Sequence, residues 1–207
     1  MKELKDLPDI ISDSRSFYQK WQETEGIDAI KGFFVEDLRR VPLKPWKRKG
    51  GLGVFINLEG TGGENDAYVC EIPPGGSLQP QKHLFEETIF ILEGRGSTTI
   101  WNEGGVKQSF EWQPGSLFSP PLNAWHQHFN SQGDKPVRYL AVTLAPIIMN
   151  IFHNNDFIFN NPFQFRDRYG DQKDYFSGEG RLCKTPDWDA RIWETNFDPN
   201  VLGINLI

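Results

Sequence analysis

Cysteine is scarce in this sequence, and the two residues present, Cys70 and Cys183, are too few for a disulfide-built scaffold. Cys70 lies in an apolar run typical of a strand, where a buried free thiol is common. The first six residues lack the apolar core of a signal peptide, and no apolar stretch approaches the length of a membrane span. These absences predict a reduced, cytoplasmic protein without a membrane partner.

Clustered positive charge is also missing. The net charge is −6, and no face rich in lysine and arginine is apparent, which argues against a nucleic-acid partner. The basic cluster from Lys44 to Lys49 is short and is interrupted by Pro45. We interpret this cluster as a solvated linker.

Aromatic residues, by contrast, are plentiful. They make up 14% of the 207 residues, and charged residues make up 24%, a composition typical of a globular chain with a substantial core. We expect a central domain at 50–146 between an N-terminal arm (1–49) and a C-terminal extension (147–207). The arm should contain a short helix at 12–25, capped by Asp13 or Ser14. The aromatic segment 147–182 should pack across the central domain or against a second subunit.

The central region consists of short alternating segments separated by turns rich in glycine and proline. Many short strands with no helical period between them predict an all-β fold, either an antiparallel sandwich or a barrel. The expected strands are residues 52–58, 67–72, 88–92, 97–101, 107–112, 116–119, 125–129 and 137–143.

Histidine is rare, yet three of the four histidines lie in or beside two short stretches of this central region. The first stretch carries Gln81, His83 and Glu87, and the second carries His126 and His128. Side chains two apart in a strand share a face, so Gln81 and His83 can both point into a barrel. Closure of the barrel can bring His126 opposite this pair. Nitrogen and oxygen donors around one point in an apolar interior suit a divalent transition metal.

The two stretches resemble the paired motifs of the cupin family. The first motif is matched by Gly75, Gln81, His83, Glu87 and Gly94, with glutamine in place of one histidine. The second is matched by Gly115, Pro121, Asn123, His126 and Asn130, with asparagine in place of one glycine. The resemblance covers residues 50 to 145, and it implies a double-stranded β-helix, the jelly-roll barrel of cupins, with a metal inside.

The change at Gln81 leaves the set of metal ligands open. If its carboxamide stays off the metal, His83, Glu87 and His126 form a two-histidine, one-carboxylate set that favours Fe(II) and oxygen chemistry. If Gln81 binds, the set is similar to that of cupin-type sugar-phosphate isomerases, which use zinc. A metal-free barrel, in which Gln81 only forms hydrogen bonds, is the third reading. His128 could be a proton shuttle, a substitute ligand or a buried core histidine.

We therefore expect one divalent ion per chain, Fe(II) in preference to Mn or Zn, and a small-molecule substrate. The leading hypothesis is a mononuclear non-haem Fe(II) dioxygenase acting on a small aromatic or enolisable organic acid, with His128 as a catalytic residue. The alternatives are a redox-free isomerase, decarboxylase or lyase, and a non-catalytic module that binds a small ligand. The aromatic arms favour a homodimer, and the chain could be one half of a two-barrel protein.

Overall fold

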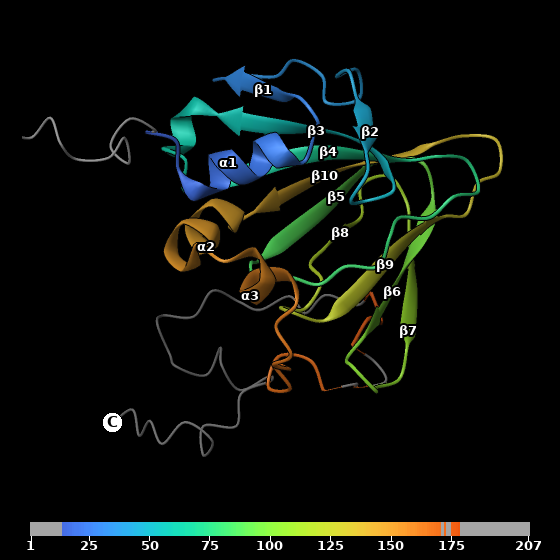
Figure 1. Ribbon diagram of the computed structural model, residues 1–207. Helices are drawn as coiled ribbons and strands as arrows, with labels where there is room; N and C mark the ends of the chain where they lie inside the picture. Colours follow the sequence, from blue (N-terminus) through green and yellow to red (C-terminus); the bar gives the residue numbers. More distant parts are fainter. Residues whose placement is uncertain (1–13, 171, 173–174, 179–207) are drawn as a thin grey trace, which may run out of the picture.

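Two β-sheets form the body of the computed structural model, which describes residues 14–170, 172 and 175–178 (Figure 1). The larger sheet has the order β1-β3-β4-β10-β5-β8, with β2 also paired to β3, and the smaller sheet has the order β7-β6-β9. The strands of the larger sheet are β1 (Ala29–Gly32), β2 (Lys44–Trp46), β3 (Gly51–Leu58), β4 (Asp66–Ile72), β5 (Glu87–Glu93), β8 (Leu117–Phe118) and β10 (Val137–Thr143). Those of the smaller sheet are β6 (Gly96–Trp101), β7 (Gln108–Trp112) and β9 (Trp125–Asn130). The predicted all-β barrel is confirmed.

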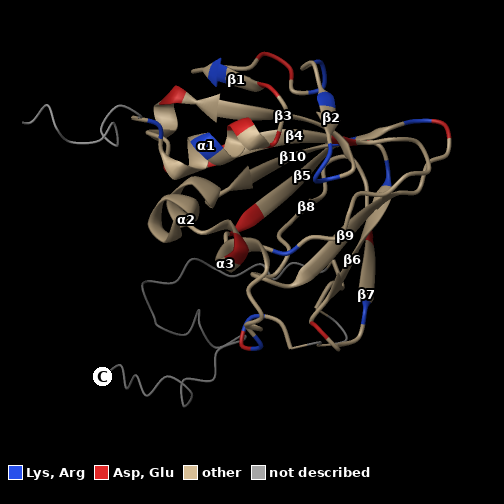
Figure 2. Cartoon of the chain, in the orientation of Figure 1, with Lys and Arg blue, Asp and Glu red and all other residues tan. Residues whose placement is uncertain are grey.

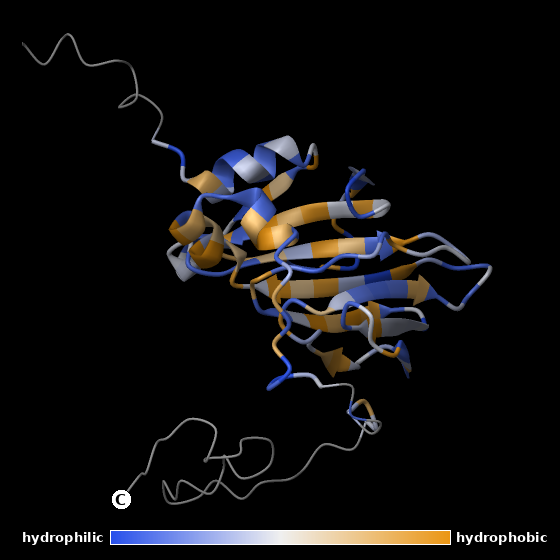
Figure 3. Ribbon diagram, turned by 60° about the horizontal axis from the view of Figure 1, so that its bottom comes forward, coloured by the Kyte–Doolittle hydropathy of each residue, from blue (hydrophilic) through white to orange (hydrophobic). Residues whose placement is uncertain are grey.

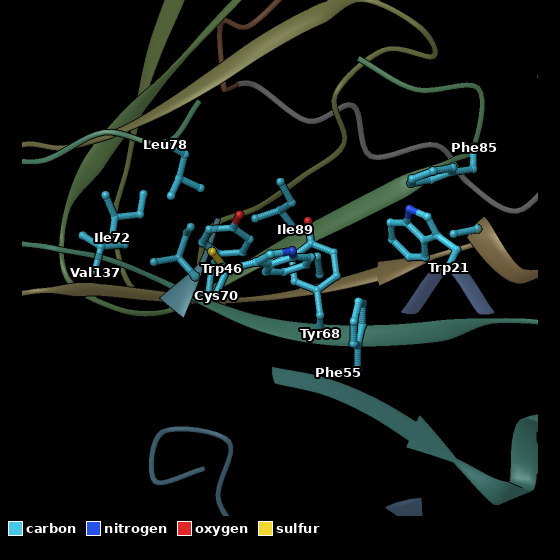
Figure 4. Packing of buried hydrophobic residues seen from close by; sticks show 14 of the residues in the cluster. Trp21, Trp46, Phe55, Tyr68, Cys70, Ile72, Leu78, Phe85, Ile89 and Val137 are labelled. Carbon is cyan, nitrogen blue, oxygen red and sulfur yellow. The ribbon is translucent and has the colours of Figure 1, made fainter. Parts of the chain in front are cut away.

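The barrel interior is filled by the alternate side chains of its strands. On β4, residues Tyr68, Cys70 and Ile72 are at most 4% exposed, because side chains two apart in a strand share a face. Figure 3 shows apolar residues concentrated along the strands, and Figure 4 shows these side chains meeting in one cluster. Cys70 is a buried free thiol, as predicted.

One row of residues across the larger sheet places two carboxylates inside the barrel. Across the sheet, Asp66 of β4 pairs with Thr143 of β10, and Thr143 pairs with Glu87 of β5. Residues that are directly opposite in a sheet point to the same face, so both carboxylates enter the barrel at the same level. Glu87 thus begins β5 inside the barrel, as the sequence pattern predicted.

A short N-terminal helix, α1 (Phe17–Thr24), packs at one end of the barrel (Figure 1). Its cap is Ser16, which forms a capping box with Gln19, so the predicted cap at Asp13 or Ser14 is wrong. Trp21 is buried and meets Phe55 of β3 edge-on, with ring centroids 5.8 Å apart. This contact fixes α1 over the interior of the barrel.

The basic segment after Pro42 is not a solvated linker, and that prediction is wrong. Residues Lys44–Trp46 form β2, and Trp46 is 1% exposed because its ring covers β3. Gly53 makes this possible, since a Cβ atom there would lie 2.4 Å from the Trp46 ring. Lys49 then turns into the barrel and is 3% exposed.

The chain after β10 forms α2 (Ala145–Phe152), the one-turn helix α3 (Asn155–Phe159) and an irregular segment. The central residue of that segment is Tyr169, which is buried against Ile100 and Ala124. Ile158 of α3 is also buried in the barrel core. The described part of the aromatic segment therefore packs on the barrel. The segment 188–207 and Cys183 lie outside the described residues.

The surface carries mixed charge and some apolar side chains. Figure 2 shows positive and negative residues interspersed over the described part. Phe90, Leu117 and Val142, on the neighbouring strands β5, β8 and β10, are 38%, 66% and 42% exposed. The homodimer stays a prediction.

Among the described residues, no helix has both the length and the apolarity to cross a membrane.

Candidate metal centre

Three segments bring His83, Glu87 and His126 to one point inside the barrel. Glu87 begins β5, and His126 lies on β9 of the opposite sheet. His83 follows Gln81, whose backbone forms an isolated bridge with His126. We predicted a strand through Gln81 and His83, but this segment is irregular apart from that bridge. His83 nevertheless points into the barrel, as predicted, and is 5% exposed.

The three side chains present acceptor atoms to one another. His83 Nε2 lies 3.5 Å and His126 Nε2 lies 3.8 Å from Glu87 Oε2. Both distances exceed the roughly 2.7–3.2 Å of an N–H···O hydrogen bond. None of the three atoms has a hydrogen-bond partner among the described residues. Buried polar atoms are rarely left in this state, so a further group is expected between them.

The tautomers of both histidines explain why no hydrogen bond forms. The Nδ1 atom of His83 lies 2.8 Å from the carbonyl oxygen of Phe85, and that of His126 lies 3.1 Å from the carbonyl oxygen of Ala124. A carbonyl oxygen can only accept, so each Nδ1 carries the proton. In its neutral form each imidazole then presents an unprotonated Nε2 to Glu87, as metal-ligating histidines do.

The spacing and the ionisation of these groups fit a divalent ion. Donors about 2.0–2.2 Å from a shared ion lie roughly 2.8–3.6 Å apart, close to the 3.5 and 3.8 Å that separate Glu87 Oε2 from His83 Nε2 and His126 Nε2. Burial alone would raise the pKa of Glu87, but the charge of Lys49 holds that pKa well below its ordinary value. Burial, with His83 and His128 nearby, lowers the pKa of His126 well below its ordinary value. An ionised carboxylate and a neutral imidazole are the states that metal ligands require.

Two residues that the sequence did not single out contact Glu87. The Tyr68 hydroxyl donates a hydrogen bond to Glu87 Oε1 and accepts one from the Lys49 ammonium. The Lys49 Nζ atom lies 4.0 Å from the same Oε1. Burial lowers the pKa of Lys49, and the charge of Glu87 opposes that shift. The only sequence signal for Tyr68 was its place on the inward face of an apolar strand.

His128 enters the same interior, two residues beyond His126. It is 2% exposed, and its Nδ1 atom lies 2.8 Å from Thr98 Oγ1, which also accepts a hydrogen bond from Trp112 Nε1. A hydroxyl can donate or accept, so this contact does not fix the tautomer as the carbonyls do for His83 and His126. Burial lowers the pKa of His128 to about 3. Its catalytic role stays a prediction.

Gln81 and the turn residues of the motifs also have definite places. Gln81 is half-buried in the wall of the cavity beside His83 and Glu87, and its role as a ligand stays a prediction. Gly75 and Gly94 both have positive φ, as their predicted turns require. Asn123 has φ 58°, and its side chain donates to the carbonyl oxygens of Asn161 and Phe163. These contacts attach the loop before His126 to the C-terminal segment.

Trp21, Arg48 and Phe85 line the cavity beside His83 and Glu87, and Phe159 packs behind them; we call these four side chains the aromatic cover. Phe85 stacks on the His83 ring at 3.9 Å, and Phe159 contacts both Phe85 and Trp21. The Arg48 guanidinium lies over the rings of Trp21 and Phe159 and pairs with Glu25 at 2.6 Å. Beneath the cover the free volume is about 10 Å³, about enough for one water. A larger molecule can enter only if the cover moves.

The family of the central domain is now defined. Residues 68–143 match the family model Cupin_2, described as the cupin domain. The chain therefore contains a cupin domain, and the resemblance inferred from the two motifs is confirmed. Within that domain, His83, Glu87 and His126 form a buried candidate metal site. Lys49 and α1 precede the matched residues.

Likenesses to solved structures are distant. The formate complex of Lactobacillus farciminis oxalate decarboxylase has a TM-score of 0.44 at 21% identity, over 53% of this chain and 32% of that chain. The cupin domain of Schizosaccharomyces pombe Cnp3 has a TM-score of 0.44 at 17% identity, over 56% of this chain and 71% of that chain. This chain thus covers about a third of the decarboxylase. At these TM-scores neither likeness bears on the reaction. A search of the curated proteins found no match.

Proposed function

We propose that this chain is a mononuclear metal-dependent cupin enzyme that uses Fe(II) and oxygen on a small aromatic or enolisable organic acid. The observation that carries the proposal is the group of three mutually facing acceptor atoms, from two imidazoles and one carboxylate, that lack a donor among the described residues. This is the donor set of non-haem Fe(II) oxygenases, which keep further positions open. When bound there, Fe(II) supplies the activation of oxygen.

Charge in the pocket favours an acidic substrate. Lys49 and Arg48 both line the cavity beside Glu87. Arg48 is paired with Glu25, but with a divalent ion bound, the ion and Lys49 together carry more positive charge than the Glu87 carboxylate balances, and a buried excess of charge is costly. A substrate carboxylate reduces that excess. The ammonium of Lys49 has three donors, and its contact with Tyr68 uses one of them.

Aromatic walls favour a small planar or apolar body on that acid. Trp46, Phe55 and Phe85 line the same cavity, at a depth where solvent is excluded. Exclusion of water strengthens electrostatic interactions and protects reactive intermediates from hydrolysis. The small free volume means that binding of substrate and movement of the aromatic cover occur together.

Elemental analysis combined with oxygen uptake tests the proposal. The chain is purified without chelator and its metal content is measured. The apo form is then loaded anaerobically with Fe(II), Mn(II) or Zn(II), and oxygen consumption is followed with a panel of small aromatic and enolisable carboxylic acids. We expect substrate-dependent oxygen uptake with Fe(II), and none for His126→Ala. The matched control is His153→Asn, an exposed histidine at φ 48°, a backbone conformation that asparagine tolerates.

Three other results would replace the proposal. Turnover with zinc or manganese and no oxygen uptake would make the chain a redox-free isomerase, decarboxylase or lyase. Binding of an acid without turnover would make it a ligand-binding module. Stoichiometric metal in His126→Ala would refute the ligand assignment itself.

A further inference from the structure

The two oxygens of the Glu87 carboxylate have different surroundings. Oε1 accepts a hydrogen bond from Tyr68, whereas Oε2 faces His83 and His126 and has no hydrogen-bond partner within the described part of the chain. Glu87 and Tyr68 are 1% and 4% exposed, so solvent does not compensate for the difference. One oxygen is therefore occupied by the protein, and the other is free.

The hydrogen bonds at Oε1 run in one direction. Tyr68 Oη lies between the Lys49 ammonium and the Glu87 carboxylate. An ammonium only donates, and an ionised carboxylate only accepts. The hydroxyl proton of Tyr68 must therefore point to Oε1, and Lys49 determines that orientation.

Packing holds this arrangement in place. The Lys49 Nζ atom lies 4.1 Å from the centroid of the Tyr68 ring and 5.1 Å from that of the Trp46 ring. Trp46 meets Tyr68 edge-on at 5.1 Å. Between β4 and β5, the β10 residue opposite Tyr68 is Ala141, whose small side chain leaves room for the tyrosine to reach Glu87.

We propose that Lys49 and Tyr68 are positioning residues that restrict Glu87 to one-oxygen ligation of the metal. This inference rests on the proposed metal centre. Carboxylates bind metal ions through one oxygen or through both. Because Oε1 is held by Tyr68, a bound ion would keep open the coordination position that a two-oxygen carboxylate would fill. In the proposed reaction that position is available to the substrate or to oxygen.

Co(II) is the probe for this inference, because its visible absorption weakens as its coordination number rises. Tyr68→Phe removes the hydroxyl and keeps the ring. We expect weaker absorption per bound Co(II), and a Co(II) dissociation constant raised by about 10- to 100-fold. Lys49→Met is a second variant, which should change the absorption in the same direction. The control is Tyr139→Phe, a buried tyrosine of β10 whose hydroxyl makes no hydrogen bond to Glu87. It should match the wild type in both measurements.

The possible results separate the inference from the proposed function. If Tyr68→Phe keeps the wild-type Co(II) absorption and affinity, the inference is wrong, even where the variant melts at a lower temperature. If the wild-type chain takes up no Co(II) at all, the proposed metal centre fails, and the inference fails with it.

Discussion

Two buried carboxylates, Asp66 and Glu87, lie in one row of the larger sheet on either side of Thr143. Each accepts a hydrogen bond from a tyrosine, Tyr18 for Asp66 and Tyr68 for Glu87. Their positions in the barrel are therefore similar, and the differences between them come from the other neighbours.

Those neighbours give the two carboxylates different tasks. Asp66 Oδ2 also accepts hydrogen bonds from Gln22 and Asn57, so its acceptor capacity is used by the protein. Burial raises the pKa of Asp66 to about 6. Glu87 has a lysine and two imidazoles beside it, its pKa is lowered, and one of its oxygens is free. A fully hydrogen-bonded carboxylate fastens α1 to the barrel, whereas a partly bonded one among imidazoles is suited to a metal.

Replacement of each carboxylate by its amide, in Glu87→Gln and Asp66→Asn, should give the largest difference in metal binding. Glu87→Gln replaces an ionic ligand by a neutral one, and we expect the metal dissociation constant to rise by more than about 100-fold, beyond the loss usual for outer-shell partners. Asp66→Asn should leave it unchanged. Equilibrium dialysis with elemental analysis measures both. Equal metal binding by the two variants would contradict the distinction.

Metal addition should stabilise the chain through Glu87 and not through Asp66. At a free metal concentration of 100 times the dissociation constant, the gain is about 2.7 kcal/mol, or roughly 5–10 °C in melting temperature for a chain of this size. Calorimetry with and without metal should show this rise for the wild type and for Asp66→Asn, and its loss in Glu87→Gln. A rise that persists in Glu87→Gln would place the metal elsewhere.

Removal of the Asp66 carboxylate should cost stability without loss of metal binding. Asp66→Ala leaves the donors of Tyr18, Gln22 and Asn57 without their acceptor, and we expect a loss of about 2 kcal/mol in the free energy of unfolding. Urea unfolding of the metal-free chain measures this loss. A change below about 0.5 kcal/mol would mean that Asp66 does not hold α1.

The last contrast between the two carboxylates is the sign of their pH dependence of stability. The pKa of Asp66 is raised from 3.8 to about 6 in the folded chain, so the folded state binds the proton more tightly. Stability from this group is present below pH 3.8 and is lost as the pH rises to 6, by at most about 1.4 kcal/mol per pH unit. The pKa of Glu87 is lowered in the folded chain, so its contribution to stability is present above its ordinary pKa of 4.5 and is lost as the pH falls below that value. Unfolding between pH 4.5 and 6.5 should therefore show a slope that Asp66→Asn reduces. Identical slopes would exclude Asp66 as the cause.

Patterns local in sequence predicted much of this structure. Alternation and turn residues located β3 to β10 but missed β1 and β2, and the motif spacing predicted that His83, Glu87 and His126 meet at one point. These features depend on neighbours within a few residues of each other, or on a spacing that the family preserves. The helices α2 and α3 were not predicted as helices, because aromatic and asparagine residues are weak helix formers.

Features that depend on distant partners could not be predicted. Lys49 looked like one more charge in a basic linker, because its partners Tyr68 and Glu87 come much later in the chain. Its burial is explained only by the aromatic rings and the carboxylate that folding places around it. Ser16 was missed as the cap for a smaller reason, since several residues before α1 can cap a helix and their backbone angles decide which one does.

The aromatic cover has a further consequence for how such a protein can diversify. Trp21 and Arg48 come from the arm that precedes residue 68, whereas the candidate ligands lie within 68–143. The cover therefore combines side chains from before, within and after the matched residues, since Phe85 lies among the candidate ligands and Phe159 follows them. Substitutions at Trp21 or Arg48 alone would reshape this cover without altering a candidate ligand, whereas exchange of the whole arm would also remove Lys49 from Glu87.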